Sequence, residues 1–397
     1  MAKIQQEETN MTVKFLKAAL VIAVVFSLAS SAFASEASQA INNFAFNAGK
    51  IIMAGNSGDF FFSPYSIISA FGMAYAGAAG DTAREIEEAL GITQDVHDSL
   101  GALTRDLDKS GYVSSANRVW LKEGLTLLKN YTDALRLNYN STAKELDIKG
   151  RTQESRTEIN DWVSEKTNGK INDLLQTLDP ETQMVITNAV YFNAEWKRKF
   201  PKSATEKEKF YVEGERTKDV DMMKQRDDFL YSEADGVKAV MLPYKGNKLS
   251  MIAVLPPKNN LDAVRNADAE TFAKWIEAME TYDIDLWLPK FKTEKSYELK
   301  NVFEALGIKQ AFTDDADFSG ITGDEPLKAD AVIHKTFIDV DEEKTEAAAA
   351  TAIPMMFGSA MPVQRPFAEF HADRPFMYFI RDNETGAILF MGYQTFR

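Results

Sequence analysis

Apolar residues recur at helical spacing near the start of the chain. Between 36 and 54 they fall every three or four positions, which predicts an amphipathic helix. Residues 59–64 predict a short buried strand that ends at proline, and Ser66 is expected to open an apolar helix through Ala79. Helices are therefore expected to dominate this part of the chain.

Two further helices are indicated by local signals. Thr82 and Glu85 match a capping box, in which the two side chains satisfy free amides at the start of a helix that runs to Leu90. Apolar residues around Trp162 mark another helix, which we expect to end near Gly169.

The second half of the chain favours strands. Segments 183–192, 237–242 and 248–256 are rich in apolar and β-branched residues, and 282–288 alternates between an apolar face and a mixed face that holds two aspartates and Trp287. In that last segment Asp283 and Asp285 share one strand face, which we interpret as a solvated sheet face in preference to paired carboxylates for acid–base catalysis. Without regular strand–helix alternation, and with no linker or internal repeat, the pattern predicts a single α+β domain over 35–397.

Composition narrows the function classes. Lys and Arg number 45 against 59 Asp and Glu, so the net charge of −14 disfavours nucleic acid as a partner. The chain has no cysteine, which excludes disulfides, thiolate catalysis and zinc held by cysteine. Its 45% hydrophobic and 26% charged residues are typical of a folded soluble protein.

The first 34 residues predict a secretory signal peptide. Lys14 and Lys17 precede an apolar run from 18 to 28, and Ala32 and Ala34 stand three and one positions before the expected cut. Residues 1–10 form an upstream leader, with Met11 as an alternative initiator. A membrane anchor is the weaker alternative, because the run is shorter than the roughly 20 residues that a spanning helix needs. We therefore expect an exported protein, extracellular or periplasmic, with no membrane association after processing.

Motifs for enzymatic chemistry are absent from the sequence. No G-x-S-x-G surrounds a serine, none of the histidines His97, His334 and His371 sits in a hydrolase motif, and there is no H-E-x-x-H, P-loop or G-x-G-x-x-G. The acidic residues at 314, 315 and 317 lack the spacing of a calcium loop. We expect no catalytic residues, no cofactor and no metal, hence no enzyme.

The most unusual segment lies between Asp341 and Pro362. As a helix, its alanine run would end within two turns at Thr351 and Pro354. As a strand, its odd-numbered positions from 345 to 357 form one uncharged face, whose side chains are small at the start and large at the end. Glu346 lies on the other face. Such a segment fits between existing strands without burying an unpaired charge. A flexible alanine-rich linker is the alternative from this segment alone.

Short motifs along the whole chain resemble the serpin family. The match covers about 41–396 and is carried, in order, by 61–66 (FFSPYS), 77–82 (GAAGDT), 160–162 (NDW), 167–171 (TNGKI), 187–192 (TNAVYF), Trp196, 242–246 (LPYKG), 288–291 (LPKF), 316–320 (ADFSG), 334–337 (HKTF), 373–376 (DRPF) and 389–392 (LFMG). The resemblance implies a serpin fold of three β-sheets and about nine α-helices, with an exposed reactive-centre loop at about 342–370.

The resemblance also implies a mechanism. A target protease cuts the loop and forms an acyl-enzyme, and the freed hinge enters the main sheet as a new strand before water releases the enzyme. The hinge would comprise Glu342, Lys344, Thr345, Glu346, Ala347, Ala348, Ala349, Ala350 and Thr351. From Thr345 to Gly358 the strand would span roughly 43 Å at about 3.3 Å per residue.

Six other residues match positions that control loop entry in the family. Ser63, Ser66, Asn188 and His334 match a polar cluster beneath the sheet that must part, although a satisfied core histidine alone explains His334. Trp196 and Lys290 match the point of entry, and Lys290 is expected to form an ion pair with Glu342.

Two residues depart from the family pattern. Lys344 stands where glycine is usual, so its side chain would slow entry of the hinge into the sheet. Pro354 has no backbone N–H, so the inserted strand would lack one hydrogen bond to its neighbour.

The cut is expected among Met356, Phe357, Gly358 and Ser359, which suits chymotrypsin-, subtilisin- or elastase-like serine proteases, with a cysteine protease as a further class of target. Arg365 is the basic candidate, but Pro366 follows it and disfavours trypsin-like enzymes. The sequence therefore predicts a monomeric, secreted inhibitor of serine endopeptidases. The alternative is a non-inhibitory binding or chaperone-like protein on the same fold.

Overall fold

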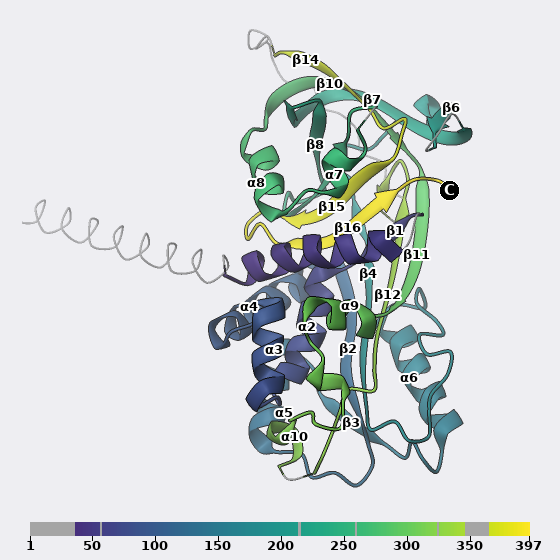
Figure 1. Ribbon diagram of the computed structural model, residues 1–397. Helices are drawn as coiled ribbons and strands as arrows, with labels where there is room; N and C mark the ends of the chain where they lie inside the picture. Colours follow the sequence, from purple (N-terminus) through teal and green to yellow (C-terminus); the bar gives the residue numbers. More distant parts are fainter. Residues whose placement is uncertain (1–35, 56–57, 213–215, 259, 324, 346–364) are drawn as a thin grey trace, which may run out of the picture.

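The computed structural model describes residues 36–55, 58–212, 216–258, 260–323, 325–345 and 365–397. The expected signal peptide, the expected hinge from Glu346 to Thr351 and the expected cut site from Met356 to Ser359 lie outside these ranges. The molecule has a β-rich end and a mainly helical end, joined by long strands that run between them (Figure 1).

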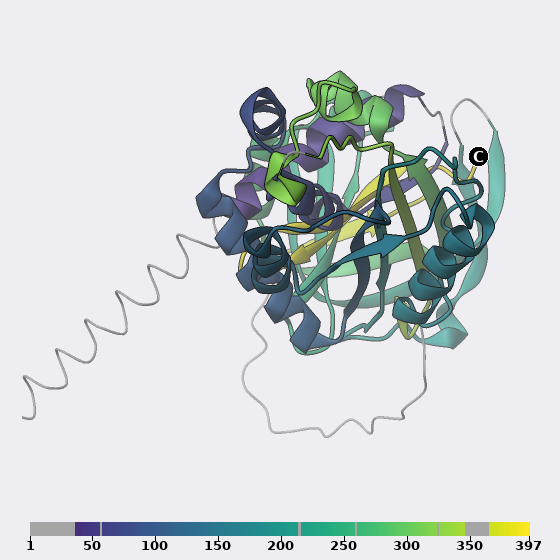
Figure 2. The same cartoon turned by 90° about the horizontal axis from the view of Figure 1, so that it is seen from below.

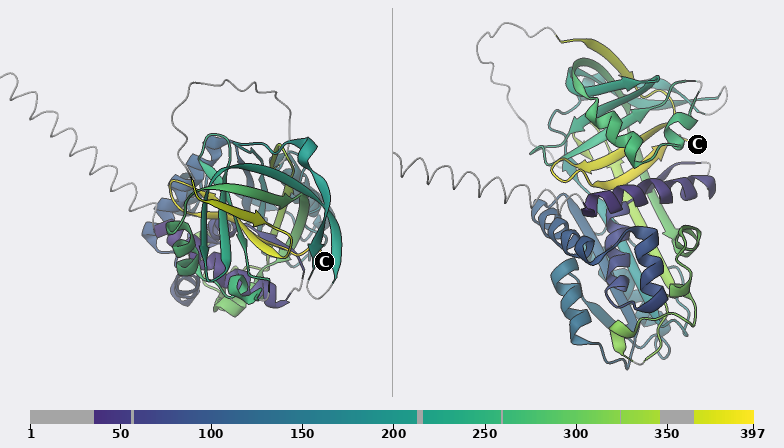
Figure 3. Two further views of the ribbon diagram at one scale, coloured as in Figure 1. Left: turned by 90° about the horizontal axis from the view of Figure 1, so that it is seen from above. Right: turned by 60° about the vertical axis from the view of Figure 1, so that its left-hand side comes forward.

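A long helix over 36–55 opens the described chain and crosses between the two ends of the molecule (Figure 3). Phe46 of this helix packs against Phe379, with ring centres 5.6 Å apart. The described ranges hold nine further α-helices and two short 3₁₀ turns: α2 (Pro64–Tyr75), α3 (Gly80–Leu90), α4 (Gln94–Ser110), α5 (Lys129–Tyr139), α6 (Thr152–Lys166), α7 (Asp262–Arg265), α8 (Ala269–Glu277), α9 (Lys300–Leu306), α10 (Ser319–Thr322), η1 (Lys202–Ala204) and η2 (Gln310–Phe312).

The larger sheet has nine strands and occupies the β-rich end. Eight follow the order β1-β16-β15-β9-β8-β7-β10-β14, and β6 pairs with β7 outside that path. Their bounds are β1 (Phe60–Phe62), β6 (Glu206–Tyr211), β7 (Thr217–Ala234), β8 (Val237–Pro243), β9 (Leu249–Leu255), β10 (Glu280–Pro289), β14 (Phe367–His371), β15 (Phe376–Asp382) and β16 (Ile388–Gln394).

The smaller sheet has seven strands and extends into the helical end. Its order is β3-β2-β4-β12-β13-β5, with β11 paired to β12 outside that path. The strands are β2 (Val113–Lys122), β3 (Ala143–Leu146), β4 (Met184–Phe192), β5 (Ala194–Glu195), β11 (Phe291–Glu298), β12 (Ala331–Val340) and β13 (Lys344–Thr345). At its centre β4 and β12 run parallel to each other.

The α+β fold is as predicted, but the described strands form two hydrogen-bonded sheets where three were expected. The long strand β7 accounts for the difference. It pairs with β10 from Met222 to Tyr231 and with β8 from Leu230 to Ala234, so two sets of strands become one continuous sheet.

The strand predictions hold closely: 183–192, 237–242, 248–256 and 282–288 correspond to β4, β8, β9 and β10. On β10, Asp283 accepts hydrogen bonds from Arg226 at 2.9 Å, and Asp285 lies 2.9 Å from the imidazole of His371. The two carboxylates thus have separate partners on a partly exposed face, in agreement with the interpretation as a sheet surface.

Helix α2 lies at the centre of the molecule and contacts β2, β4 and β16. It is buried on all sides from Pro64 to Ala74, as expected of a helix apolar all round. The prediction that Ser66 opens it is wrong: the helix begins at Pro64, whose fixed φ suits the first helical position, and ends at Tyr75. Ser63 caps it by accepting a hydrogen bond from the Ser66 amide at 3.1 Å.

The predicted capping box at Thr82 and Glu85 is also wrong. Helix α3 starts two residues earlier, at Gly80, and the Ala83 amide already donates to the Ala79 carbonyl, so Thr82 lies inside the helix and is not its cap. Thr82 instead accepts a hydrogen bond from the Asp317 amide, and Glu85 accepts from the amides of Lys309 and Gln310. Both side chains cap a segment that is distant in sequence, which a local pattern does not reveal.

Helix α6 covers the outer face of the seven-stranded sheet, opposite α3, α4 and α5 (Figure 2). Ile159 and Val163 of α6 are fully buried against side chains of β2 and β4. This helix corresponds to the one predicted around Trp162. None of the helices in the described ranges has the length and apolarity needed to cross a lipid bilayer.

Candidate functional site

Four of the residues matched to the family's sheet-opening site form one buried hydrogen-bonded cluster. His334 Nε2 accepts a hydrogen bond from the Ser63 amide at 3.0 Å, and His334 Nδ1 contacts Asn188 Oδ1. Asn188 Nδ2 donates to the Ser66 hydroxyl at 2.6 Å and to the Ser66 carbonyl at 2.7 Å. All four residues are fully buried. The polar groups therefore satisfy one another between α2 and the sheet.

Local structure sets these positions. Ser63 and Ser66 flank the start of α2 and bond to His334 of β12 and Asn188 of β4. Asn188 and His334 are directly opposite each other on the parallel strands β4 and β12. The cluster therefore spans the contact between the two central strands, and separating them would break its hydrogen bonds.

His334 is held in its neutral form. Nε2 accepts from a backbone amide, so Nδ1 carries the proton and donates it to Asn188. A second proton on Nε2 would face the N–H of Ser63. Complete burial lowers the pKa of His334 to about 3, against a smaller opposing effect of the hydrogen bond with Asn188.

This gives a testable pH dependence. The unfolded chain binds a proton near pH 6.5, whereas folded His334 resists protonation down to about pH 3. Between pH 7 and pH 5 the free energy of unfolding should therefore fall by about 2 kcal/mol through this residue. Urea unfolding of the wild type and of His334→Gln at both pH values measures the effect. An equal loss in the variant would contradict it.

Trp196, Lys290 and Glu342 meet at the top of the same sheet. Lys290 Nζ lies 2.7 Å from Glu342 Oε2, so the expected ion pair is formed. The indole of Trp196 donates to the Asp341 carbonyl at 2.9 Å, and its ring stacks on Tyr244 with centres 4.6 Å apart. These contacts fix the chain where β12 ends and the expected hinge begins.

Glu342 is buried but stays ionised. Burial alone would raise its pKa, but hydrogen bonds from Lys290, from its own backbone and from Thr205 outweigh it and lower the pKa below its usual value. Thr205 donates to Oε1 at 2.9 Å, and the Glu342 carbonyl accepts from the Phe200 amide at 2.9 Å. The residue therefore holds the hinge to Lys290 and to the segment from Phe200 to Thr205.

The first residues of the hinge are already part of the sheet. Lys344 and Thr345 form β13, in which Thr345 pairs antiparallel with Val340 of β12 and with Ala194 of β5. Lys344 pairs with Glu195, so its backbone occupies a strand position despite the departure from the family pattern. The hinge thus enters the top of the sheet between the strand that ends at Val340 and the strand that begins at Ala194.

Sequence reasoning missed two residues of this region. Asn117 of β2 accepts from Asn188 Nδ2 at 2.7 Å and from the Ser66 hydroxyl at 3.3 Å, so it extends the buried cluster. Thr205 joins the contacts of Glu342. Asn117 carried one signal that was overlooked, an amide side chain in the middle of a predominantly apolar or small-residue strand. Thr205 lies in an irregular segment and carried none.

The three histidines have other partners than a catalytic triad requires. His97 Nδ1 is 2.7 Å from the Tyr139 hydroxyl, His334 belongs to the buried cluster, and His371 stacks on Trp287 beside Asp285. Within the described ranges, no serine hydroxyl is hydrogen-bonded to any of these imidazoles. No group of three or more acidic or imidazole side chains converges there as metal ligands would.

Comparison with known proteins agrees with this architecture. The profile of the serpin (serine protease inhibitor) family matches residues 39–395. An uncharacterized serpin-like protein of Thermococcus kodakarensis is 40% identical over 361 residues, which cover 89% of this chain and 84% of the relative. Human Serpin B3 is 36% identical over 386 residues, covering 89% and 98% of the two chains. The solved structure of a tumour suppressing serpin superposes with a TM-score of 0.83 at 28% identity, over 91% of this chain and all of the other. This chain belongs to the serpin family, whose members are generally inhibitors of proteases and mostly not catalytic enzymes.

Proposed function

We propose that the protein is an exported inhibitor of serine endopeptidases that traps its target covalently by inserting the cleaved loop into the seven-stranded sheet. The observation that carries this proposal is β13. Its two residues already pair on both sides, with β12 and with β5, at the top of the sheet. After cleavage, the segment that follows Thr345 is free to continue in the same direction.

The register of β13 continues through the sheet. Val340 and Ala194 both pair with Thr345. Their separation in residue number equals that between paired residues of β12 and β4, such as His334 and Asn188. A strand that continues from Thr345 is therefore antiparallel to both neighbours and stays in phase with both. In that register Thr351 lies opposite His334 and Asn188, at the buried cluster.

The same register decides which loop side chains would be buried. Thr345 is opposite Val340, and Val340 faces the core. Directly opposite residues point to the same side of a sheet, so the odd-numbered positions of the inserted loop would face inward. This is the uncharged face found in the sequence. Glu346 would lie opposite exposed Asn193 and half-buried Asp339, away from the core.

Pro354 is compatible with this arrangement. It would lie opposite Ala331 and Val185, which form the last pair between β12 and β4. Its missing N–H therefore falls at the end of the ladder, where one lost donor matters least. The expected cut at 356–359 comes after this point, so the loop could fill the paired length of the sheet.

The described contacts also support the choice of target. Arg365, the basic candidate, forms an ion pair with Asp228, and the carbonyl of Pro366 accepts from the Asp283 amide at 2.9 Å. Cleavage there would require both contacts to open. We therefore propose cleavage among Met356, Phe357, Gly358 and Ser359 by a chymotrypsin-, subtilisin- or elastase-like enzyme, with cysteine proteases as secondary targets.

A gel experiment tests inhibition directly. The protein is mixed with chymotrypsin, subtilisin or elastase and separated in denaturing detergent. We expect a covalent complex of the combined mass with at least one of them, and mass spectrometry should place the cut among 356–359. Clean cleavage without a complex for all three, and for trypsin and papain, would favour the non-inhibitory alternative. A cut after Arg365 would overturn the proposed specificity.

We also propose that the protein is exported as a monomer after removal of residues 1–34. The apolar run at 18–28 and the small residues before Ser35 support export. Amino-terminal sequencing of the protein recovered from the periplasm or medium should begin at Ser35. Retention of the unprocessed chain inside the cell would contradict export, and a dimer in light scattering would contradict the monomer.

A further inference from the structure

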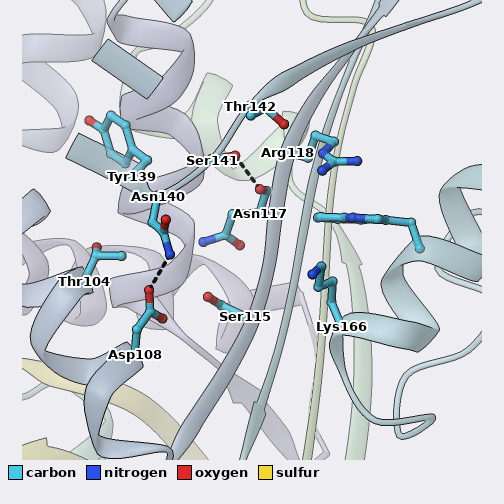
Figure 4. A pocket seen from close by; sticks show the side chains of 11 residues that line it. Thr104, Asp108, Ser115, Asn117, Arg118, Tyr139, Asn140, Ser141, Thr142 and Lys166 are labelled. Atoms are coloured by element: carbon cyan, nitrogen blue, oxygen red, sulfur yellow. Dashed lines mark hydrogen bonds between the residues drawn. The ribbon is translucent and has the colours of Figure 1, made fainter. Parts of the chain in front are cut away.

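A cavity of about 440 Å³ lies beside the seven-stranded sheet, at the edge of β2 (Figure 4). Strand β3 pairs with β2 only from Val119 to Lys122, so the preceding residues of β2 have no neighbouring strand on that side. Helices α4, α5 and α6 surround the gap. The volume falls within the range of about 300–1,000 Å³ that is typical of small-molecule sites.

Two cations line the cavity and form no ion pair among the described residues, although the carboxylate of Glu158, which pairs with Lys144, also attracts Arg118 electrostatically. Arg118 of β2 places its guanidinium 4.1 Å from the ring centre of Trp162, and its Nε is buried without a hydrogen-bond partner. Lys166, at the end of α6, lines the same cavity. No ion pair to either is found among the described residues, although the chain has 59 acidic residues for 45 basic ones. The guanidinium of Arg118 can bind an anionic group through two N–H groups, and the ammonium of Lys166 adds a compact positive charge.

The opposite wall has a different character. Asp108 of α4 accepts a hydrogen bond from Asn140 at 3.0 Å, and the hydroxyl of Ser141 donates to the Asn117 carbonyl at 2.7 Å. In Figure 4 Asp108 and Asn140 lie across β2 from Arg118 and Lys166. An anionic group would be repelled by Asp108, whereas a hydroxyl could donate to it. The cavity therefore distinguishes the two ends of a ligand.

From this geometry we propose that the cavity binds a small polyhydroxylated anion, of the class of sugar phosphates and sugar acids. The acidic group binds Arg118 and Lys166, and the hydroxyl groups face Asp108 and Asn140. The site is separate from the proposed reactive loop, and it shares Asn117 with the buried cluster.

The wall of the cavity touches the buried cluster through Asn117. This residue lines the cavity and accepts hydrogen bonds from both Asn188 and Ser66. Parting β4 from β12 requires movement of the sheet relative to α2, and a ligand that bridges β2 to α4 and α6 resists that movement. On the proposed inhibitory function, bound ligand should therefore slow insertion of the loop.

Titration calorimetry on the intact protein tests the site, with glucose 6-phosphate as probe and gluconate as the sugar acid. Glucose and inorganic phosphate serve as the two half-ligands. We expect saturable binding of glucose 6-phosphate or gluconate, at least tenfold tighter than either half-ligand. Binding should quench the fluorescence of Trp162, and this quenching should be lost in Trp162→Phe.

Charge variants locate the anion. Arg118→Gln and Lys166→Gln should each weaken binding at least tenfold, whereas Lys109→Gln, an exposed charge on α4 outside the cavity, should leave it unchanged. Because Lys166 is exposed at a helix end, its variant stays informative if Arg118→Gln fails to fold. The proposal is overturned if neither polyhydroxylated anion binds, if glucose or phosphate binds as tightly, or if the two variants bind like wild type.

The effect of bound ligand on loop insertion is measured separately. With saturating ligand, the formation of covalent complex with the protease should slow at least threefold in the wild type and not in Lys166→Gln. If the ligand binds but the rate of complex formation does not change, the proposed effect on loop insertion is wrong, whereas the proposed binding site is supported. Intact binding with no covalent complex under any condition would instead refute the proposed function.

Discussion

Cleavage of the loop between Met356 and Ser359 is expected to raise the Tm by about 20 °C. In the proposed inserted state, 346–354 becomes a strand between β4 and β12. One parallel ladder is then replaced by two antiparallel ladders, which are slightly more stable per residue. At about 1 kcal/mol net per added hydrogen bond, the gain is on the order of 10 kcal/mol. A domain of this size gains roughly 2 °C of Tm per kcal/mol.

Calorimetry of the intact and cleaved protein at equal concentration measures this gain. The control is intact protein carried through the same procedure with inactivated protease. Because the segment stays covalently attached to Thr345, the result should not depend on protein concentration. Coinciding melting curves would show that the cut loop stays outside the sheet, and the proposed mechanism would fail.

The second large effect is expected from neighbouring residues on opposite faces of the inserted strand. If the proposed inserted strand continues in the register of β13, Ala347 would lie opposite Ile338 and Phe192, which are both fully buried. An arginine there would bring an unpaired charge into the core, which costs several kcal/mol. We expect Ala347→Arg to reduce the yield of covalent complex at least tenfold and to turn the protein into a substrate of its target.

Glu346→Arg is the matched control, because in the proposed inserted strand that position would lie opposite half-buried Asp339 and exposed Asn193, on the accessible side. It should keep most of the complex yield. Gel densitometry of complex against cleaved protein, at a fixed ratio of inhibitor to protease, gives both yields. If the two variants lose inhibition equally, or if Glu346→Arg is the more severe, the register is not the one that we infer from Thr345.

Much of the fold followed from local patterns. The alternation at 282–288 and the apolar run at 183–192 predicted β10 and β4, because the side-chain period of a strand is visible in sequence. The grouping of Ser63, Ser66, Asn188 and His334 was not visible in this way. These residues are distant in sequence, and only the ordered match to a known family indicated that they meet.

The errors have a common physical cause. Thr82 and Glu85 have the correct spacing for a capping box, yet both bond to segments more than 200 residues away. Asn117 was overlooked because its partners Ser66 and Asn188 lie on other elements. Hydrogen bonds between distant segments depend on tertiary packing, which neither periodicity nor spacing encodes.

The pairing of Thr345 with two strands has a consequence for how the loop tolerates insertions and deletions. Adding or removing one residue between Thr345 and Pro354 would exchange the inward and outward faces of everything downstream, and so drive side chains selected for solvent into the core. A change of two residues would preserve the alternation. Beyond Pro354, where the ladder has ended, a change of any length should be neutral for entry. Loop length in natural variants of this chain should therefore vary on the carboxyl side of residue 354 and stay fixed, or change in steps of two, before it.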